Sequence, residues 1–191
     1  TSGVQLWNIK IDGNLSDTPS FASGNFYFGT TSGSLYSVNN NGRINWIKNF
    51  SGVVGTTPVI SNGTIYFGDE NGYIYALNVS TGDQIWSFNS QSSFISSPAV
   101  SNNGFIDEAT ISGTLFSLYS SNGTLFWELN LGTTITASPV LNDGLLFLVS
   151  TSGTIYAIGT PSVKSYTVTF TENGLPPGVS WSVTLNGITE S

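Results

Sequence analysis

Short apolar runs alternate with small polar turns along residues 57–89, TPVISNGTIYFGDENGYIYALNVSTGDQIWSFN. The turns are of the Asn-Gly and Thr-Gly type, which supply the positive φ angles that tight hairpins need. The runs between them are rich in aromatic and β-branched residues, which favour strands. The segment therefore predicts four short antiparallel strands, at residues 58–60, 64–68, 73–77 and 84–88.

The same pattern recurs along most of the chain. Three residue sets share its period, and their members follow one another at intervals of 39 to 41 residues. The sets are Trp7, Trp46, Trp86 and Trp127; Pro19, Pro58, Pro98 and Pro139; and Gly33, Gly72, Gly113 and Gly153. Four antiparallel strands in about 40 residues is the size of one propeller blade. We therefore expect an all-β propeller in which the tryptophans dock one blade on the next.

The two ends of the repeat array are incomplete in complementary ways. Residues 3–11 (GVQLWNIKI) align with the last strand of a unit, three complete units follow, and the last unit at residues 138–159 lacks its fourth strand. Pairing the N-terminal strand with the last unit gives four blades and removes two exposed edges. This pairing can occur within one chain, between two chains that form an eight-blade ring, or head to tail in a filament.

The repeat consensus S/T-P-x-V-x-x-G-x-I-Y-F-G-x-x-x-G-x-I-Y-A-L-x-x-x-T-G-x-x-x-W resembles the pyrroloquinoline-quinone (PQQ) type of β-propeller repeat over residues 1–159. The resemblance implies the fold, although such rings usually have seven or eight blades. PQQ-dependent dehydrogenases of this fold stack the cofactor on a tryptophan, many against a vicinal disulfide, and hold calcium near an Asp base. Here there is no cysteine, and the repeat tryptophans stand at packing positions. We therefore expect no enzyme activity and no cofactor.

The character of the sequence changes after residue 160, which predicts a propeller at residues 1–160 and a tail at residues 161–191. The tail has a strand pattern from Tyr166, a Gly-Leu-Pro-Pro-Gly turn and a second strand pattern. It resembles the start of a small Ig-like β-sandwich repeat found in secreted and surface proteins of thermoacidophilic archaea, including relatives of thermopsin. The residues that carry the resemblance are Phe170 to Glu172, Gly174 to Pro176, Gly178 and residues 180–187.

Composition narrows the function classes. Only 8% of the residues are charged, the net charge is −7, and the basic residues are Lys10, Arg43, Lys48 and Lys164. Phosphate binding needs clustered Lys and Arg, so neither nucleic acid nor an anionic membrane is an expected partner. The chain has no Cys and no His, which removes thiol chemistry and the commonest general base. It contains no apolar run of the ~18 residues that a membrane span needs.

The remaining polar surface must consist mainly of Ser, Thr, Asn and Gly, and such a surface suits a secreted protein in acidic surroundings. The chain lacks Met and begins at Thr1, so we expect a processed or excised segment. Asn62, Asn78 and Asn122 fall in predicted exposed turns. They belong to five candidate N-glycosylation sites: Asn14, Asn49, Asn62, Asn78 and Asn122.

One strand of the third unit departs from the repeat. It reads Ile106-Asp107-Glu108 where the other units have aromatic or aliphatic residues. A buried carboxylate needs a partner, so one interpretation is a cation site or a polar contact with a neighbouring subunit. The other is a strand that is locally exposed or distorted. Calcium would use Asp107 or Glu108 with Asp69 and backbone carbonyls, but no spaced ligand motif accompanies them, so we expect no metal.

Together these features predict a non-enzymatic extracellular protein of the cell surface, which assembles through strand exchange into a filament or surface layer. The alternative is a secreted propeller that binds or adheres to a protein or a glycan. The expected partners are further copies of the chain or other cell-surface proteins.

Overall fold

A computed structural model describes residues 2–159, 183–185 and 188–190 of the 191-residue chain. The chain divides into two compact units, residues 1–160 and residues 161–191. All regular structure in the described residues is β, and no helix long and apolar enough to cross a membrane occurs among them. The all-β prediction is therefore confirmed.

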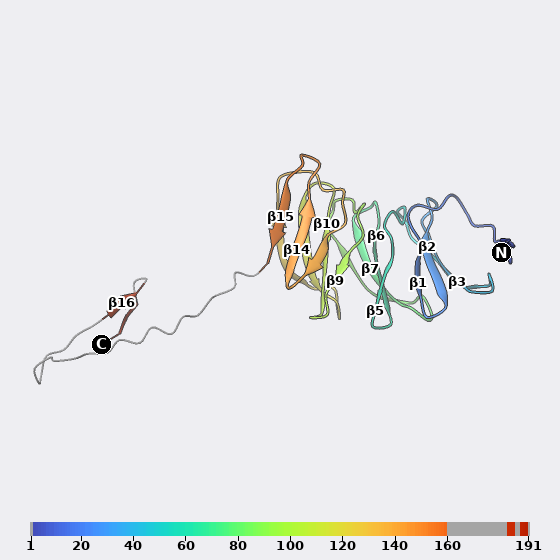
Figure 1. The fold of residues 1–191 in the computed structure, drawn as a ribbon, viewed down its shortest axis with the longest axis horizontal. Helices are drawn as coiled ribbons and strands as arrows, with labels where there is room; N and C mark the ends of the chain where they lie inside the picture. Colours follow the sequence, from blue (N-terminus) through green and yellow to red (C-terminus); the bar gives the residue numbers. More distant parts are fainter. Residues whose placement is uncertain (1, 160–182, 186–187, 191) are drawn as a thin grey trace, which may run out of the picture. The chain divides into compact units, whose positions relative to one another are not determined.

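Four antiparallel sheets built from consecutive strands make up the first unit (Figure 1). The first sheet consists of β1 (Ser20–Ala22), β2 (Asn25–Gly29), β3 (Ser34–Asn39) and β4 (Ile44–Asn49). The second consists of β5 (Val59–Ser61), β6 (Thr64–Gly68), β7 (Tyr73–Asn78) and β8 (Gln84–Asn89). The third consists of β9 (Ala99–Val100), β10 (Phe105–Ala109), β11 (Thr114–Tyr119) and β12 (Leu125–Asn130). The fourth has β13 (Val140–Asn142), β14 (Leu145–Val149) and β15 (Ile155–Ile158).

The local geometry repeats as closely as the sequence does. The glycine between the second and third strands of every sheet has a positive φ, between 81° and 88°, which L side chains rarely adopt. In each four-stranded sheet the ladder between the last two strands contains one irregularity, next to the residue that pairs with the repeat tryptophan. The tryptophan therefore faces the same way in each of these sheets.

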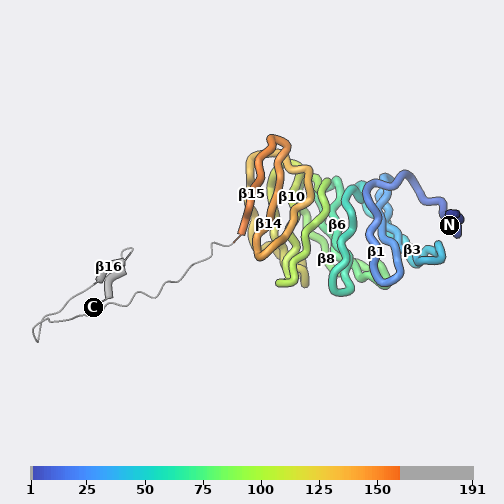
Figure 2. The backbone as a smooth tube through the Cα atoms, in the orientation of Figure 1, coloured from blue at the N-terminus to red at the C-terminus, as the bar shows by residue number. Residues whose placement is uncertain are grey.

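Neighbouring sheets pack face to face in chain order. Their first strands contact one another in the sequence β1 to β5, β5 to β9 and β9 to β13. Between successive sheets lie three apolar clusters, centred on Tyr27 and Phe67, on Tyr66 and Phe116, and on Leu115 and Leu148. In Figure 2 the sheets stand side by side, with β1 toward one end and β15 at the other.

The strand predicted over residues 3–11 is not formed. These residues belong to no sheet, and the described contacts include neither a ladder between them and β15 nor a contact between β1 and β13. A strand needs a partner for its backbone N–H and C=O groups. Residues 3–11 have none in the single chain, so the pairing predicted to close the ring is not formed within it.

In the second unit, β16 (Val183–Leu185) pairs antiparallel with β17 (Ile188–Glu190). β16 lies within the second strand pattern predicted for the tail. The predicted first strand from Tyr166 and the Gly-Leu-Pro-Pro-Gly turn lie outside the described residues.

Candidate functional site

Each interface between the first three sheets contains a tryptophan that reaches across to the following sheet. The indole N–H of Trp46 in β4 donates to the carbonyl of Val79 at 3.2 Å. Trp86 in β8 does the same to Ser120 at 2.9 Å. A glycine lies under each indole ring, and a β-carbon there would overlap the ring; these glycines are Gly82 and Gly123.

Trp7 makes the same contact, although it belongs to no sheet. Its indole N–H donates to the carbonyl of Asn40 at 2.8 Å, and its ring atoms lie 2.7–2.9 Å from the position of a β-carbon on Gly42. Residues 3–11 therefore lie where the outer strand of a preceding sheet would lie. With no such sheet present, Trp7 is 38% exposed, whereas Trp86 is 7% exposed.

Asp12 attaches the same segment to the first sheet. Its carboxylate accepts hydrogen bonds from the hydroxyls of Tyr36 at 2.9 Å, Thr30 at 3.2 Å and Ser34. The hydrogen bond from Ser34 is the main cause that lowers the pKa of Asp12, and those from Tyr36 and Thr30 lower it further. The sequence analysis missed Asp12, because the three hydroxyls that identify its role come from another part of the repeat.

The first sheet turns an apolar face away from the second sheet. This face carries Phe28, Tyr36 and Val38, which are buried beneath residues that include Ile9 and Ile11. The cover over this end of the first sheet is incomplete, as a comparison of the apolar residue in the loop before each sheet shows. Leu15 is 45% exposed, whereas its equivalents Val54, Phe94 and Ile135 are 0% exposed between sheets.

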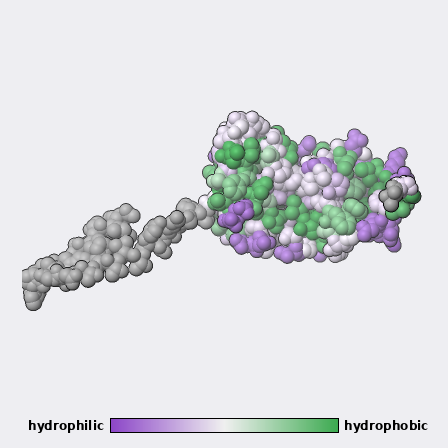
Figure 3. Space-filling model, viewed as in Figure 1, coloured by the Kyte–Doolittle hydropathy of each residue, from purple (hydrophilic) through white to green (hydrophobic). Residues whose placement is uncertain are grey.

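The fourth sheet is incomplete at the other end of the array. One edge of β15 has no strand partner among the described residues. Ile155 is 71% exposed, whereas the equivalent residues Leu35, Ile74 and Leu115 are 0% exposed. In the side view of Figure 3, apolar residues lie among polar ones at this end of the first unit. Trp127, the last of the four repeat tryptophans, packs partly buried against the cluster between the third and fourth sheets.

These two ends have the features of the two sides of one interface between sheets. One end offers a docked outer strand and an apolar face, and the other offers an open strand edge and an apolar face with Ile155. Aligning the repeats could have identified Ile155. The alignment places Ile155 at the position that a buried core residue occupies in each of the three preceding units, whereas no further sheet packs on the fourth sheet among the described residues. We call residues 3–11 the donor segment and β15 the acceptor edge.

All five candidate glycosylation asparagines are exposed. Asn62 and Asn122 lie in turns, and Asn14 lies in the loop before β1. Asn78, which the sequence predicted in an exposed turn, is instead the last residue of strand β7. Asn49 likewise ends strand β4, where its side-chain carbonyl accepts a hydrogen bond from the Ser34 hydroxyl at 2.9 Å.

The two acidic residues of β10 are buried in a regular strand, so the interpretation of a locally exposed or distorted strand is wrong. β10 pairs along its length with β11, Asp107 is 5% exposed, and Glu108 and Asp69 are 0% exposed. Burial raises the pKa of Asp107, and Ser117 partly opposes that shift. No group of three or more His, Cys, Asp or Glu side chains suited to a metal ion occurs in the described part of the chain.

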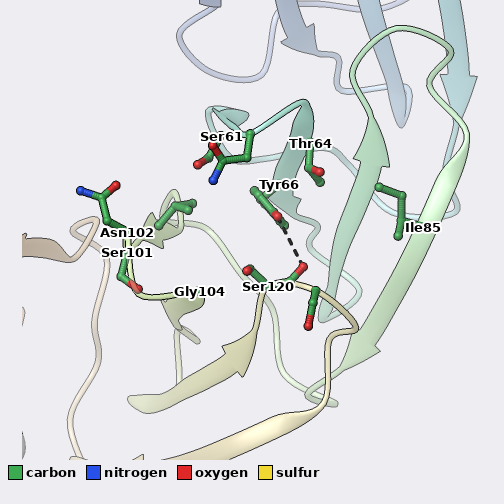
Figure 4. Close-up of a pocket in the computed structure, with 11 residues that line it drawn as sticks. Ser61, Thr64, Tyr66, Ile85, Ser101, Asn102, Gly104 and Ser120 are labelled. Atoms are coloured by element: carbon green, nitrogen blue, oxygen red, sulfur yellow. Dashed lines mark hydrogen bonds between the residues drawn. The ribbon is translucent and has the colours of Figure 1, made fainter.

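A hollow of about 180 Å³ lies between the turns of the second and third sheets (Figure 4). The hydroxyl of Tyr66 points across it to the carbonyl of Ser120, at 3.4 Å. Its lining is uncharged and consists mostly of hydroxyl and amide groups, together with Tyr66, Ile85 and Val100. Such a lining suits a neutral polar ligand.

Comparison with known proteins assigns the family. The chain belongs to the PQQ-like repeat family described as outer membrane protein assembly factor BamB, whose model matches residues 1–172. No curated protein sequence matches significantly. The four sheets are thus those of a BamB-like β-propeller module.

Solved structures agree on the fold. BamB from Moraxella catarrhalis superposes with a TM-score of 0.72 at 17% identity, over 80% of this chain and 52% of that chain. The present chain therefore spans about half the length of that BamB. The computationally designed Ika4 protein superposes with a TM-score of 0.74 at 16% identity, over 83% of this chain and 99% of that chain. A quinohemoprotein alcohol dehydrogenase from Pseudomonas putida HK5 matches at 15% identity with a TM-score of 0.62, over 76% of this chain and 33% of that chain. At these identities the likeness concerns the fold alone.

Proposed function

We propose that this chain is a non-enzymatic extracellular module that binds protein, and that its partner is a further copy of itself. The observation that carries the proposal is Trp7. It occupies the position of an outer-strand tryptophan on the first sheet, while the strands that should accompany it are missing. Among the described residues, the sheet of β13, β14 and β15 has no such outer strand.

In the proposed contact, the fourth sheet of one copy packs against the first sheet of another copy, beside the donor segment of that second copy. The donor segment pairs with the acceptor edge, which satisfies the backbone groups of both. Ile155 is buried against the face that carries Phe28 and Tyr36, as Ile74 is buried in the interface between the second and third sheets. The donor and the acceptor lie at opposite ends of the array, so each copy can contact two others.

Such head-to-tail association closes into a ring or continues as a filament, depending on the rotation per copy. A filament or a surface layer at the cell surface is the form that we propose. A ring of two copies is the closed alternative, and two copies would supply about the length of the BamB chain, of which one covers 52%.

An extracellular location and a non-catalytic role are supported by composition and by the surface. Charged residues are 8% of the chain, and all five candidate glycosylation asparagines are exposed. The chain has no His or Cys. The buried acidic residues are not arranged around the hollow of Figure 4.

The mass of the chain in solution tests self-association. We expect size-exclusion chromatography with light scattering to give a species well above 20.2 kDa for the intact chain. Deletion of residues 1–11, and separately Ile155→Lys, should reduce it to the monomer. Ile85→Lys is the matched control, because Ile85 is an exposed isoleucine of the second sheet, 51% exposed, and should leave association unchanged. A monomeric intact chain would contradict the proposal.

The hollow of Figure 4 favours a second candidate, a module that adheres to a glycan. Its uncharged hydroxyl and amide lining is suited to sugar hydroxyls, and Tyr66 offers an aromatic wall. Calorimetric titration with neutral oligosaccharides tests it. Binding should persist in the chain without residues 1–11 and weaken in Asn102→Ala.

A further inference from the structure

Glu108 is an acid in the apolar interface between the second and third sheets. It pairs with Phe116 across β10 and β11, at a position where the other sheets have Phe28, Phe67 and Leu148. Its side chain is fully buried, and neither carboxyl oxygen has a hydrogen-bond partner in the described part of the chain. Buried polar groups in folded proteins nearly always have partners, so this one requires an explanation.

The surroundings of the carboxyl group are apolar and close-packed. A β-carbon on Gly68 at the end of β6 would overlap Oε1 of Glu108 and would also meet the β-carbon of Phe94 at 2.5 Å. Glycine at this position therefore makes room for the carboxyl group against the backbone of the second sheet. Phe94, which is fully buried, packs in the same interface with Phe116.

The ionisable groups nearby offer no positive charge. Asp69, which follows β6 of the second sheet, is near enough for its charge to raise the pKa of Glu108; its carboxylate accepts the backbone N–H of Tyr73 at 2.8 Å and the hydroxyl of Tyr75 at 3.4 Å. Asp107 directly precedes Glu108 on the same strand, so its side chain points to the other face of the sheet. The ion pair of the described region, Lys48 with Asp83, joins the first and second sheets instead.

An ionised carboxylate in such a place is costly, because it loses its hydration and gains no hydrogen bond or cation. Burial is the main cause that raises the pKa of Glu108 well above its ordinary value, and the charge of Asp69 raises it further. A neutral carboxylic acid removes most of that cost. The close packing leaves a proton as the simplest compensating group.

We propose that Glu108 is a proton-dependent contact between the second and third sheets. When the carboxyl group is neutral, the two sheets close on each other; when it ionises, the interface loosens until water reaches the carboxylate. The array would thus be tighter in acid than at neutral pH, independently of whether its ends bind another copy.

The direction follows from linkage. The folded chain holds this proton more tightly than the unfolded chain does, so the contribution to stability is fully present below the pKa of an unfolded Glu, near 4.5. It is lost as pH rises toward the raised pKa of the folded state. Each unit by which the pKa of Glu108 is raised in the folded chain changes the unfolding equilibrium constant about tenfold across this pH range. Burial also raises the pKa of Asp69 and of Asp107, so these residues contribute in the same direction.

Urea denaturation between about pH 4 and pH 8 tests the effect on stability. The intact chain should lose stability as pH rises, by at least tenfold in the unfolding equilibrium constant. Glu108→Gln, which keeps the shape without the charge, should flatten that profile. Glu108→Leu, the residue type of the fourth sheet at this position, should flatten it as well. Glu128→Gln is the control, because Glu128 is an exposed residue of the same sheet. Equal slopes in all four proteins would overturn the proposal.

Two measurements on the folded chain place the effect. With ¹³C-labelled glutamate carboxyls, one of the five glutamates should titrate well above the others, and its signal should disappear in Glu108→Gln. With 5-fluorotryptophan, the ¹⁹F signal of Trp86, which joins the second and third sheets, should shift in the same pH range, while that of Trp46 should not. Ordinary titration of all five glutamates, or an unchanged Trp86 signal, would show that the contact is not proton-dependent.

Discussion

The indole ring of Trp7 lies directly on Gly42, in the same arrangement that Trp46 and Trp86 make with the glycines of their following sheets. Trp46 and Trp86 each belong to a complete four-stranded sheet. Trp7 keeps the contact with no strand beside it, so the interface of a missing sheet is half assembled in the free chain.

This arrangement predicts different costs for removing two tryptophans. Trp86→Ala creates a cavity between two sheets and should destabilise the fold by about 3 to 5 kcal/mol. Trp7→Ala removes a partly exposed side chain at an open end, so less than half of that loss is expected. Urea denaturation of both variants, with the wild type below its association concentration, measures the difference. Equal losses would mean that the donor segment is as well packed as an inner strand.

Alanine substitutions at two glycines distinguish the energetic cost of backbone strain from that of steric overlap. Gly63→Ala places a β-carbon at φ 77° with nothing within 4 Å, so it should cost about 1 to 2 kcal/mol. Gly123→Ala has a similar φ of 70° and also overlaps the ring of Trp86, which should add about 1 to 3 kcal/mol. The free energy of unfolding of each variant tests this. A Gly123→Ala variant no worse than Gly63→Ala would mean that the tryptophan moves aside freely.

Docking of the donor segment should weaken in acid. The pKa of Asp12 is lowered in the folded chain, so its contribution is present above the pKa of an unfolded Asp and is lost as pH falls through the lowered value. The NMR signal of the Trp7 indole N–H should therefore shift toward that of a free tryptophan at low pH. Asp12→Asn should remove most of this dependence. Asp17→Asn, an exposed neighbour, should preserve it.

Glycan occupancy should follow the local backbone. Asn62 and Asn122 lie in exposed turns, so they should be modified when the chain is secreted from a glycosylating host. Asn49 and Asn78 should be modified less, because each is the last residue of a paired strand. Peptide mass spectrometry after enzymatic deglycosylation gives the occupancy of each site. Preferential modification of Asn49 would contradict this order.

The sequence was sufficient to predict the strands, because their signals are local. Turn glycines and alternating aromatic residues placed β6 at Thr64–Gly68, as observed, and placed β7 within one residue. Residues 3–11 carry the same local pattern but form no strand, because a ladder depends on a partner that local sequence does not specify. Glu108 shows the same limit for the site: its burial depends on Gly68 and Phe94, which are distant in the sequence and meet it in the interface between the second and third sheets.

The separation of the donor segment from the acceptor edge has a consequence for any assembly of the proposed kind. A copy that has lost residues 1–11 keeps β15, so it can still accept a strand, but it can offer none to the next copy. It would act as a chain stopper, as a monofunctional monomer does in step-growth polymerisation. The ratio of clipped to whole chains would then set the average length of the assembly. A protease that removes residues 1–11 would therefore control that length.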